Sequence, residues 1–182
     1  MSRDLLTQLR GWISSKCVPW FAPYWEAKKL HEGSPHGLFP RDFYHALSSE
    51  EILAAERCPR LQRAIELYRE CIDRERSAGR VLNEGIALHQ LGLVLHRQGK
   101  LGAAREAYEK ALNILEDLPA SEALPAASTC HFRLAEIYLH VGDSPSARLH
   151  LEKSQTIDET LNDKVGLEMN AELRRRTDQS MA

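Results

Sequence analysis

Histidine and cysteine are the residue types in this chain with the greatest capacity for metal binding or nucleophilic chemistry. The sequence contains eight histidines and four cysteines. His89 and His96 are seven residues apart, so they lie two turns apart on one helical face, whereas metal sites on helices use ligands three or four residues apart. The cysteines form no CxxC pair and match no zinc or redox spacing. We therefore expect no metal site and no cofactor.

Sequence motifs of common enzyme classes are also missing. The chain has no glycine-rich phosphate loop, no G-x-S-x-G nucleophile motif and no H-E-x-x-H pair. Cys58 precedes Pro59 at a predicted helix start, where the helix dipole favours a thiolate, but no histidine is paired with it in the sequence. We therefore expect no catalytic residues and a protein that is not an enzyme. An enzyme whose site has no sequence signature is the less favoured alternative.

Charge and hydropathy limit the classes of partner. The 182 residues suit one domain, and 24 basic against 26 acidic residues supply no general attraction to nucleic acid or acidic membranes. The longest stretch without a charged side chain, residues 85–96, is shorter than the roughly 18 residues of a membrane-spanning helix. The first residues lack the apolar core of a signal peptide. We expect a cytoplasmic protein that binds no nucleic acid and does not insert stably into membranes.

Two segments of the chain repeat one residue pattern at a constant distance of 43 positions. A third copy, 40 positions upstream, is clear only in its second half, at Ala64, Tyr68 and Cys71, and the segment around 48–57 fits its first half poorly. Such self-similarity is typical of repeat proteins. The matched pairs of the two clear copies are Leu91 and Leu134, Gly92 and Ala135, Leu95 and Tyr138, Gly99 and Gly142, Ala104 and Ala147, Tyr108 and Leu151, and Ala111 and Ser154.

Each clear copy predicts two antiparallel helices. Apolar residues follow helical spacing through 80–98 and again through 101–116. Gly99 suits the turn between them, because glycine accepts a positive φ. Ser144 and Pro145 suit a helix start, as N-cap and first helical residue. Small residues such as Gly92 and Ala104 are expected to face each other and let the two helices approach. No run alternates as a strand does, so we predict an all-α fold.

This order of residues resembles the tetratricopeptide repeat, and the resemblance covers about residues 60–160. The spacing of 40 to 43 residues exceeds the usual period of about 34, as in the extended-spacing subtype of the family. The resemblance implies an α-α superhelix, a solenoid of antiparallel helix hairpins with helical caps, whose first helices line a concave groove. The residues that carry it are Leu91, Gly92, Leu95, Gly99, Ala104, Tyr108 and Ala111, with their counterparts in the second copy.

The chain divides by composition into three parts. Residues 1–45 form an aromatic-rich N-terminal helical cap with a loop, residues 46–160 hold the repeats (46–79 partial, 80–120 and 121–160 clear), and residues 161–182 form a polar C-terminal capping helix and tail. All three tryptophans, Trp12, Trp20 and Trp25, lie in the first part. A hydrophobic cap over the end of the repeats is the favoured interpretation. An exposed patch that anchors a partner protein and a membrane-surface helix are the alternatives.

The resemblance implies a non-enzymatic adaptor or scaffold that binds a peptide or partner helix in its groove. A peptide- or small-ligand-sensing regulatory domain is the alternative. Self-association, or assembly as a subunit of a complex, is left open because three hairpins are near the minimum for a stable solenoid. The predicted groove combines apolar residues, imidazoles and one ion pair, at Ile86, His89, Leu93, His96, Thr129, Phe132, Arg133 and Glu136.

The two groove histidines suggest a pH dependence. If His89 and His96 face an acidic peptide, its affinity should rise as the pH falls through about 6.5, where an unperturbed imidazole gains its proton.

Overall fold

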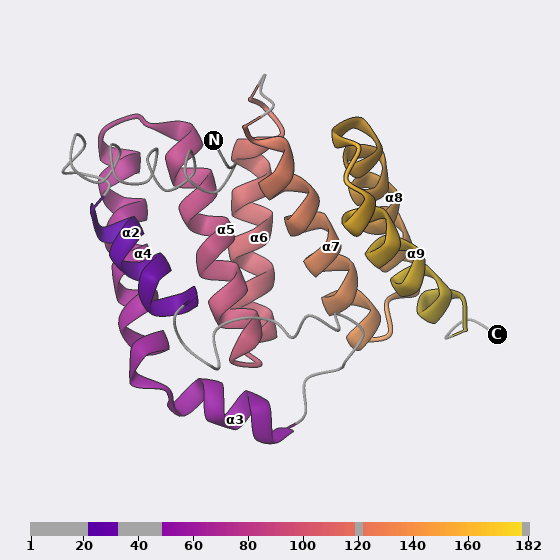
Figure 1. Cartoon of the computed structure of the whole chain (residues 1–182), viewed down its shortest axis with the longest axis horizontal. Coiled ribbons are helices and arrows are strands. Elements are labelled where there is room, and N and C mark those ends of the chain that lie inside the picture. The colour runs from indigo at the N-terminus through magenta and orange to yellow at the C-terminus, as the bar shows by residue number, and fades with distance from the viewer. Residues whose placement is uncertain (1–21, 33–48, 119–121, 180–182) are drawn as a thin grey trace, which may run out of the picture.

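A computed structural model describes residues 22–32, 49–118 and 122–179 of the chain (Figure 1). Helices are the only regular elements in these ranges, so the predicted all-α fold is confirmed. The eight helices are α2 (Ala22–Glu32), α3 (Ser49–Arg57), α4 (Pro59–Ser77), α5 (Val81–Arg97), α6 (Leu101–Leu115), α7 (Leu124–His140), α8 (Ser144–Leu161) and α9 (Lys164–Gln179).

Glycines in the left-handed region close the turns of the predicted hairpins. Gly99 joins α5 to α6 with a φ of +70°, and Gly142 joins α7 to α8 with a φ of +82°. This backbone conformation carries no steric cost for glycine. The start of α8 differs by one residue from the prediction, because the N-cap is Asp143, whose carboxylate accepts a hydrogen bond from the Ser146 N–H at 3.1 Å. Ser144 is therefore the first helical residue and Pro145 the second.

The helix that pairs with α4 comes from the N-terminal part of the chain. Helix α2 lies along α4 (Figure 1), where Ala27 is fully buried and the rings of Tyr24 and Tyr68 meet edge-on at 5.9 Å. Helix α3, which covers most of the segment 48–57, instead lies below the lower ends of α4 and α5 in Figure 1 and contacts both helices. There Gln98 donates a hydrogen bond to the Ala55 carbonyl at 3.1 Å. The poor fit of segment 48–57 to the repeat pattern follows from this position outside the row of paired helices.

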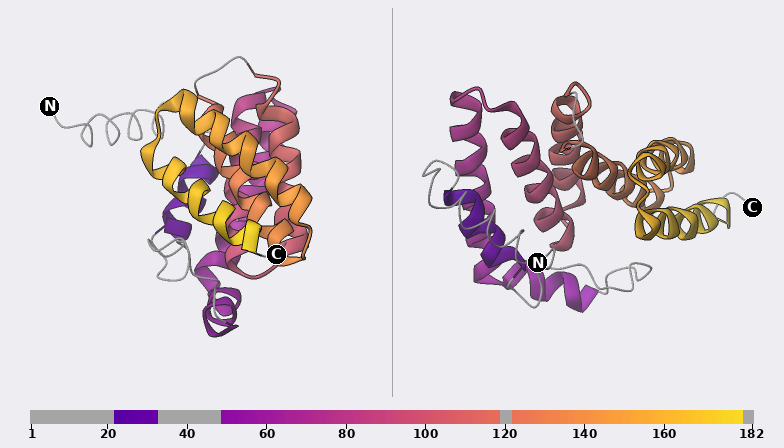
Figure 2. Two further views of the ribbon diagram at one scale, coloured as in Figure 1. Left: turned by 90° about the vertical axis from the view of Figure 1, so that its right-hand side faces the viewer. Right: turned by 45° about the horizontal axis from the view of Figure 1, so that its top comes forward.

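The paired helices form a curved stack. Contacts run between the helices of each pair, between neighbouring pairs, and also between successive first helices, in the order α2, α5, α7, α9. Comparable contacts do not join α4, α6 and α8 within the described residues. The row of first helices is therefore the shorter, inner side of the stack. Figures 1 and 2 show the ends of this row, with α2 beside α4 and α9 beside α8.

The core of each hairpin depends on the close approach of its two helices. The Tyr108 ring is fully buried, and a Cβ added at Gly92 would lie 2.5 Å from its edge. The atoms nearest to such a Cβ all belong to Tyr108. Ala104 is also fully buried. A small residue on the first helix is required because an aromatic ring occupies the space next to it.

Substitution of Gly92 by alanine is expected to destabilise the fold. The new methyl group cannot fit unless the buried Tyr108 ring moves, and overpacking of this kind costs about 1–3 kcal/mol. Gly102→Ala is the matched control, because a Cβ at this position in α6 meets nothing within 4 Å. The control should change the free energy of unfolding by less than about 1 kcal/mol, in the stabilising direction. Urea unfolding of the two variants and the wild type measures both effects. Equal stabilities of the two variants would show that the Gly92–Tyr108 contact is not tight.

Candidate binding surface

The predicted groove residues on α5 point into the helix stack. Ile86 and Leu93 are half-buried and pack against the main hydrophobic core. His89 and His96 are buried, and the His96 ring meets Tyr108 edge-on at 6.2 Å. Burial lowers the pKa of both imidazoles to about 3, with a further contribution from the charge of Arg133. Both histidines are therefore neutral between pH 6 and 7, and the expected rise in affinity through pH 6.5 loses its physical basis.

The predicted residues on α7 lie around a buried guanidinium group. Arg133 is buried, and its Nη1 donates to Glu136 Oε2 at 2.6 Å. The same guanidinium group lies 5.3 Å from the centre of the Phe132 ring, a distance at which cation–π attraction is significant. Thr129 is half-buried, one turn before Phe132 and Arg133. The ion pair expected between Arg133 and Glu136 is thus present, and it neutralises the buried charge.

A cavity of about 240 Å³ opens between α7, α8 and α9. Three predicted groove residues, Thr129, Phe132 and Arg133, line one side of it. Both α8 and α9 supply the remaining walls, which include apolar side chains and two carboxylates. The cavity therefore connects the predicted groove with the C-terminal helix. Its other lining residues are Pro125, Ser128, Ser154, Asp158, Leu161, Asp163, Val165, Gly166 and Met169.

A buried carboxylate lies in the wall of this cavity. Asp158 is only 4 % exposed. The Ser128 hydroxyl donates to its Oδ1, and Asn170 Nδ2 donates to its Oδ2 at 2.8 Å. Ser128 also lies 3.1 Å from the Ser154 hydroxyl. Desolvation raises the pKa of Asp158 above its ordinary value, although the hydrogen bond from Ser128 opposes this shift.

This polar group was not identified from the sequence, but the repeat contains a signal for it. At the 43-residue offset, Ser128, Ser154 and Asp158 correspond to Gly85, Ala111 and Leu115 of the preceding copy. Ala111 and Leu115 are buried apolar residues. Three polar side chains therefore replace three small or apolar ones at equivalent core positions. Because buried polar groups need partners, this coincidence is the observation that would have located the group.

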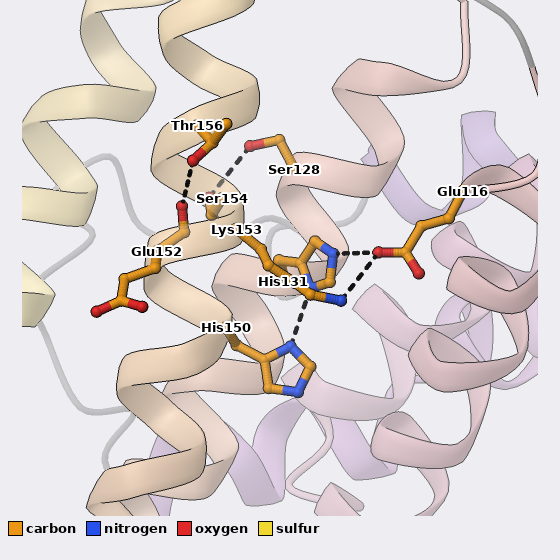
Figure 3. A network of polar contacts seen from close by, with 8 residues as sticks. All are labelled: Glu116, Ser128, His131, His150, Glu152, Lys153, Ser154 and Thr156. Carbon is orange, nitrogen blue, oxygen red and sulfur yellow. Dashed lines mark hydrogen bonds and ion pairs between the residues drawn. The ribbon is translucent and has the colours of Figure 1, made fainter.

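A second polar network lies between α6, α7 and α8 (Figure 3). His131 Nε2 and Glu116 Oε1 are 2.9 Å apart, and His131 Nδ1 and His150 Nδ1 are also 2.9 Å apart. Lys153 Nζ donates to the same Glu116 oxygen at 3.3 Å. Neutral His131 donates from Nε2 to the carboxylate and accepts at Nδ1 from His150, which is the arrangement that satisfies every contact. The network joins three helices at the junction of the two clear hairpins.

Desolvation dominates the pKa values of the two histidines in this network. Burial lowers the pKa of His131, although its contact with Glu116 acts in the opposite direction. The pKa of His150 falls to about 4, first through burial and then through the neighbouring His131 and Lys153. Desolvation alone would raise the pKa of Glu116, but hydrogen bonds from His131 and Lys153 lower it overall. The network is therefore most stable with both imidazoles neutral and Glu116 ionised.

Of the second predicted patch, only Trp25 falls in a described range, and Trp12 and Trp20 lie outside it. The Trp25 side chain is half-buried, packs against the main core and meets Tyr24 edge-on at 5.4 Å. Lys28 Nζ lies 5.7 Å from the centre of its ring. Trp25 thus contributes to the contact between α2 and the stack, and its remaining exposed surface is small.

Cys58, at the N-cap of α4, is a half-buried thiol. Cys71 and Cys130 are buried, and burial raises the pKa of the Cys71 thiol to about 12. No three histidine, cysteine or acidic side chains converge on a point that could hold a metal ion within the described ranges. No helix among those residues is long and apolar enough to cross a membrane.

Comparison with known families gives one match. Residues 54–117, which run from the end of α3 through α4, α5 and α6, match the family described as Tetratricopeptide repeat. A comparison with the curated proteins finds no match to this chain.

Folding stability is expected to fall in mild acid because of the buried histidines. An unfolded histidine has a pKa near 6.5, whereas the folded values are about 3 for His89 and His96 and about 4 for His150. The unfolded chain therefore takes up protons first, and stability is lost as the pH falls from about 6.5 towards 4. Urea unfolding at pH 7.5 and pH 5 measures the loss.

A histidine substitution separates this effect from general acid instability. His150→Gln should reduce the loss of stability between pH 7.5 and pH 5 by about 1–2 kcal/mol. The substitution removes one histidine whose pKa is lower in the folded than in the unfolded chain. His140→Gln is the control, because His140 is exposed. The explanation fails if His150→Gln keeps the pH dependence of the wild type.

Proposed function

The chain is a tetratricopeptide repeat protein, and from this premise we propose that it is a non-enzymatic adaptor or scaffold that binds a peptide or partner helix on its inner face. Repeats of this family generally mediate contacts between proteins. The observation that supports the proposal is the cavity between α7, α8 and α9, because three residues of the predicted groove line it together with the C-terminal helix.

The eight predicted residues take two different roles in this proposal. Thr129, Phe132 and Arg133 line the cavity and are placed to contact a ligand. Glu136 holds Arg133 through the 2.6 Å ion pair, which fixes the guanidinium group at the cavity wall. The residues on α5 support α7 from within the stack, and they are Ile86, His89, Leu93 and His96.

The size of the cavity favours an adaptor over a sensor of small molecules. Ligand pockets for small molecules commonly have volumes of about 300–1,000 Å³, and this cavity has about 240 Å³. A space of this size holds one side chain of a larger partner. The rest of such a partner would lie along the row of first helices, where side chains give specificity through a few buried anchors.

A matched pair of threonine substitutions tests which face binds. Thr129 on α7 lines the inner cavity, whereas Thr156 on α8 lies beside the Glu116–Lys153 contact of the network in Figure 3. Each hydroxyl donates to the carbonyl four residues earlier at 2.9 Å, so the two substitutions remove the same local hydrogen bond. Thr129→Trp should block the inner face, and Thr156→Trp should leave it open.

Binding is measured with peptides selected from a random display library against the full-length chain. We expect Thr129→Trp to lower the affinity of the selected peptides at least about tenfold, which corresponds to a loss of about 1.4 kcal/mol of binding free energy. Thr156→Trp should leave their affinity within about twofold of the wild type. Circular dichroism confirms that both variants keep their helices. Loss of binding in Thr156→Trp with full binding in Thr129→Trp would place the site on the outer face and overturn the proposal.

A further inference from the structure

We propose that the cavity between α7, α8 and α9 receives a lysine side chain of the partner, with the ammonium group held at Asp158. This inference rests on the proposed adaptor function and names the chemistry that its inner face recognises. It follows from the charge of the Asp158 carboxylate, from an unpaired acceptor on the residue that contacts it, and from the apolar side chains in the cavity wall.

The first argument is the charge of Asp158. A carboxylate that is 96 % buried is costly unless a cation is near it. No lysine, arginine or histidine within the described ranges forms an ion pair with Asp158. Asp163, a second carboxylate, lines the same cavity, but it is exposed and its Oδ1 accepts from two backbone N–H groups at the start of α9. Arg133 is the one cation among the lining residues, and Glu136 already neutralises it. Asp158 is therefore the buried carboxylate of the cavity that no cation compensates.

A second, independent observation concerns Asn170. Its Nδ2 donates to Asp158, while its Oδ1 is buried without a hydrogen-bond partner in a side chain that is 2 % exposed. A buried acceptor without a donor lowers stability, because it has lost its hydrogen bonds to water without replacing them. Asn170 contacts Asp158 but is not itself among the residues that line the cavity. The polar group around Asp158 is incompletely paired, and a ligand with a positive charge would compensate the carboxylate at the cavity wall.

The existing hydrogen bonds favour lysine over arginine. Arginine recognises carboxylates best through a two-pronged contact with both oxygens. Each oxygen of Asp158 already accepts a bond, from Ser128 and from Asn170. An ammonium group is a compact charge with three N–H donors. It can donate to the lone pair that remains on each carboxylate oxygen after the existing hydrogen bond.

The walls of the cavity suit the stem of a lysine side chain. Phe132, Leu161, Val165 and Met169 surround the approach to Asp158 with apolar surface. A lysine packs its methylene groups along such surface and places its charge at the polar end. Gly166 is part of the same wall, and a Cβ there would collide with Asp158 Oδ2. Glycine at this position therefore lets α9 approach the carboxylate closely enough to enclose it.

The test uses two blocked amino acids that differ in one charge. Nα-acetyl-lysine methylamide and Nα-acetyl-norleucine methylamide are titrated into the full-length protein, and binding is followed by the NMR signals of the Val165 and Met169 methyl groups. We expect lysine to bind at millimolar concentration and norleucine to bind at least about tenfold more weakly. Asp158→Asn should reduce lysine binding at least about tenfold, and Asp117→Asn, at an exposed position outside the cavity, should not change it.

Stability separates recognition from a structural role of Asp158. The asparagine is isosteric and removes a buried charge. Its oxygen can accept from Ser128, and its NH2 group can donate to Asn170 Oδ1 once the Asn170 amide turns over. Asp158→Asn should therefore keep or raise Tm, by up to about 2–4 °C, while it loses the lysine. A fall in Tm below that of Asp117→Asn would show that the carboxylate stabilises the fold and would contradict the proposal. Val165→Trp provides a second variant, because Val165 is 60 % exposed at the cavity and a larger side chain there blocks entry without entering the core.

The results that would disprove the lysine site differ from those that would disprove the adaptor function. Equal binding of norleucine and lysine, or unchanged lysine binding in Asp158→Asn, overturns the inference and leaves an apolar cavity. The adaptor function is judged separately, by the peptides lost in Thr129→Trp. If those peptides bind the inner face but keep their affinity after their lysines are replaced by norleucine, the adaptor proposal stands and the lysine site is wrong.

Discussion

The contact between Gly92 and Tyr108 is the constraint on which the rest of the fold depends. A fully buried aromatic ring on α6 occupies the space where a side chain on α5 would otherwise be, so the two helices pack at short distance only because one residue has no side chain. The same relation places α7 against α8, where Ala135 and Leu151 take the corresponding positions and are buried. Each hairpin is thus a unit of fixed shape, and stacking such units curves the row of first helices inward.

The sequence predicted this shape because the packing signals are local and regular. Gly99 and Gly142 mark turns that require a positive φ, and the 43-residue offset relates residues in equivalent environments. The pairing of α2 with α4 could not be predicted in the same way. Residues 33–48 separate α2 from the helices that follow it, and the position of α2 depends on contacts distant in sequence, such as Tyr24 with Tyr68. The nearest segment by sequence, α3, was the natural but incorrect candidate for the first helix of the partial copy.

The groove residues illustrate the limit of reasoning from a family pattern. Position in the repeat assigned residues of α5 and α7 to the inner side, but it carried no information on how deeply each side chain is buried. His89 and His96 belong to the packed interior, whereas Thr129 lines a cavity. Helix α7 contacts α5, α6, α8 and α9, as α5 contacts α2, α3, α4, α6 and α7. The presence of neighbouring helices therefore does not explain the difference, which lies in the cavity that the junction of α7, α8 and α9 leaves open.

In the second clear copy, the repeat pattern is modified at three buried positions, where polar side chains replace small or apolar ones. In the preceding copy, Gly85 and Leu115 meet directly, since a Cβ at Gly85 would lie 2.8 Å from the Leu115 side chain. In the final copy, Ser128 and Asp158 take these positions and form a hydrogen bond. A leucine at position 158 would pack as Leu115 does and would need neither Ser128 nor Asn170. An apolar contact of that kind is commonly as stable as a buried polar one or more so. Stability alone therefore gives no reason for a buried carboxylate here, whereas a cation bound from outside does, because its binding energy depends on that charge.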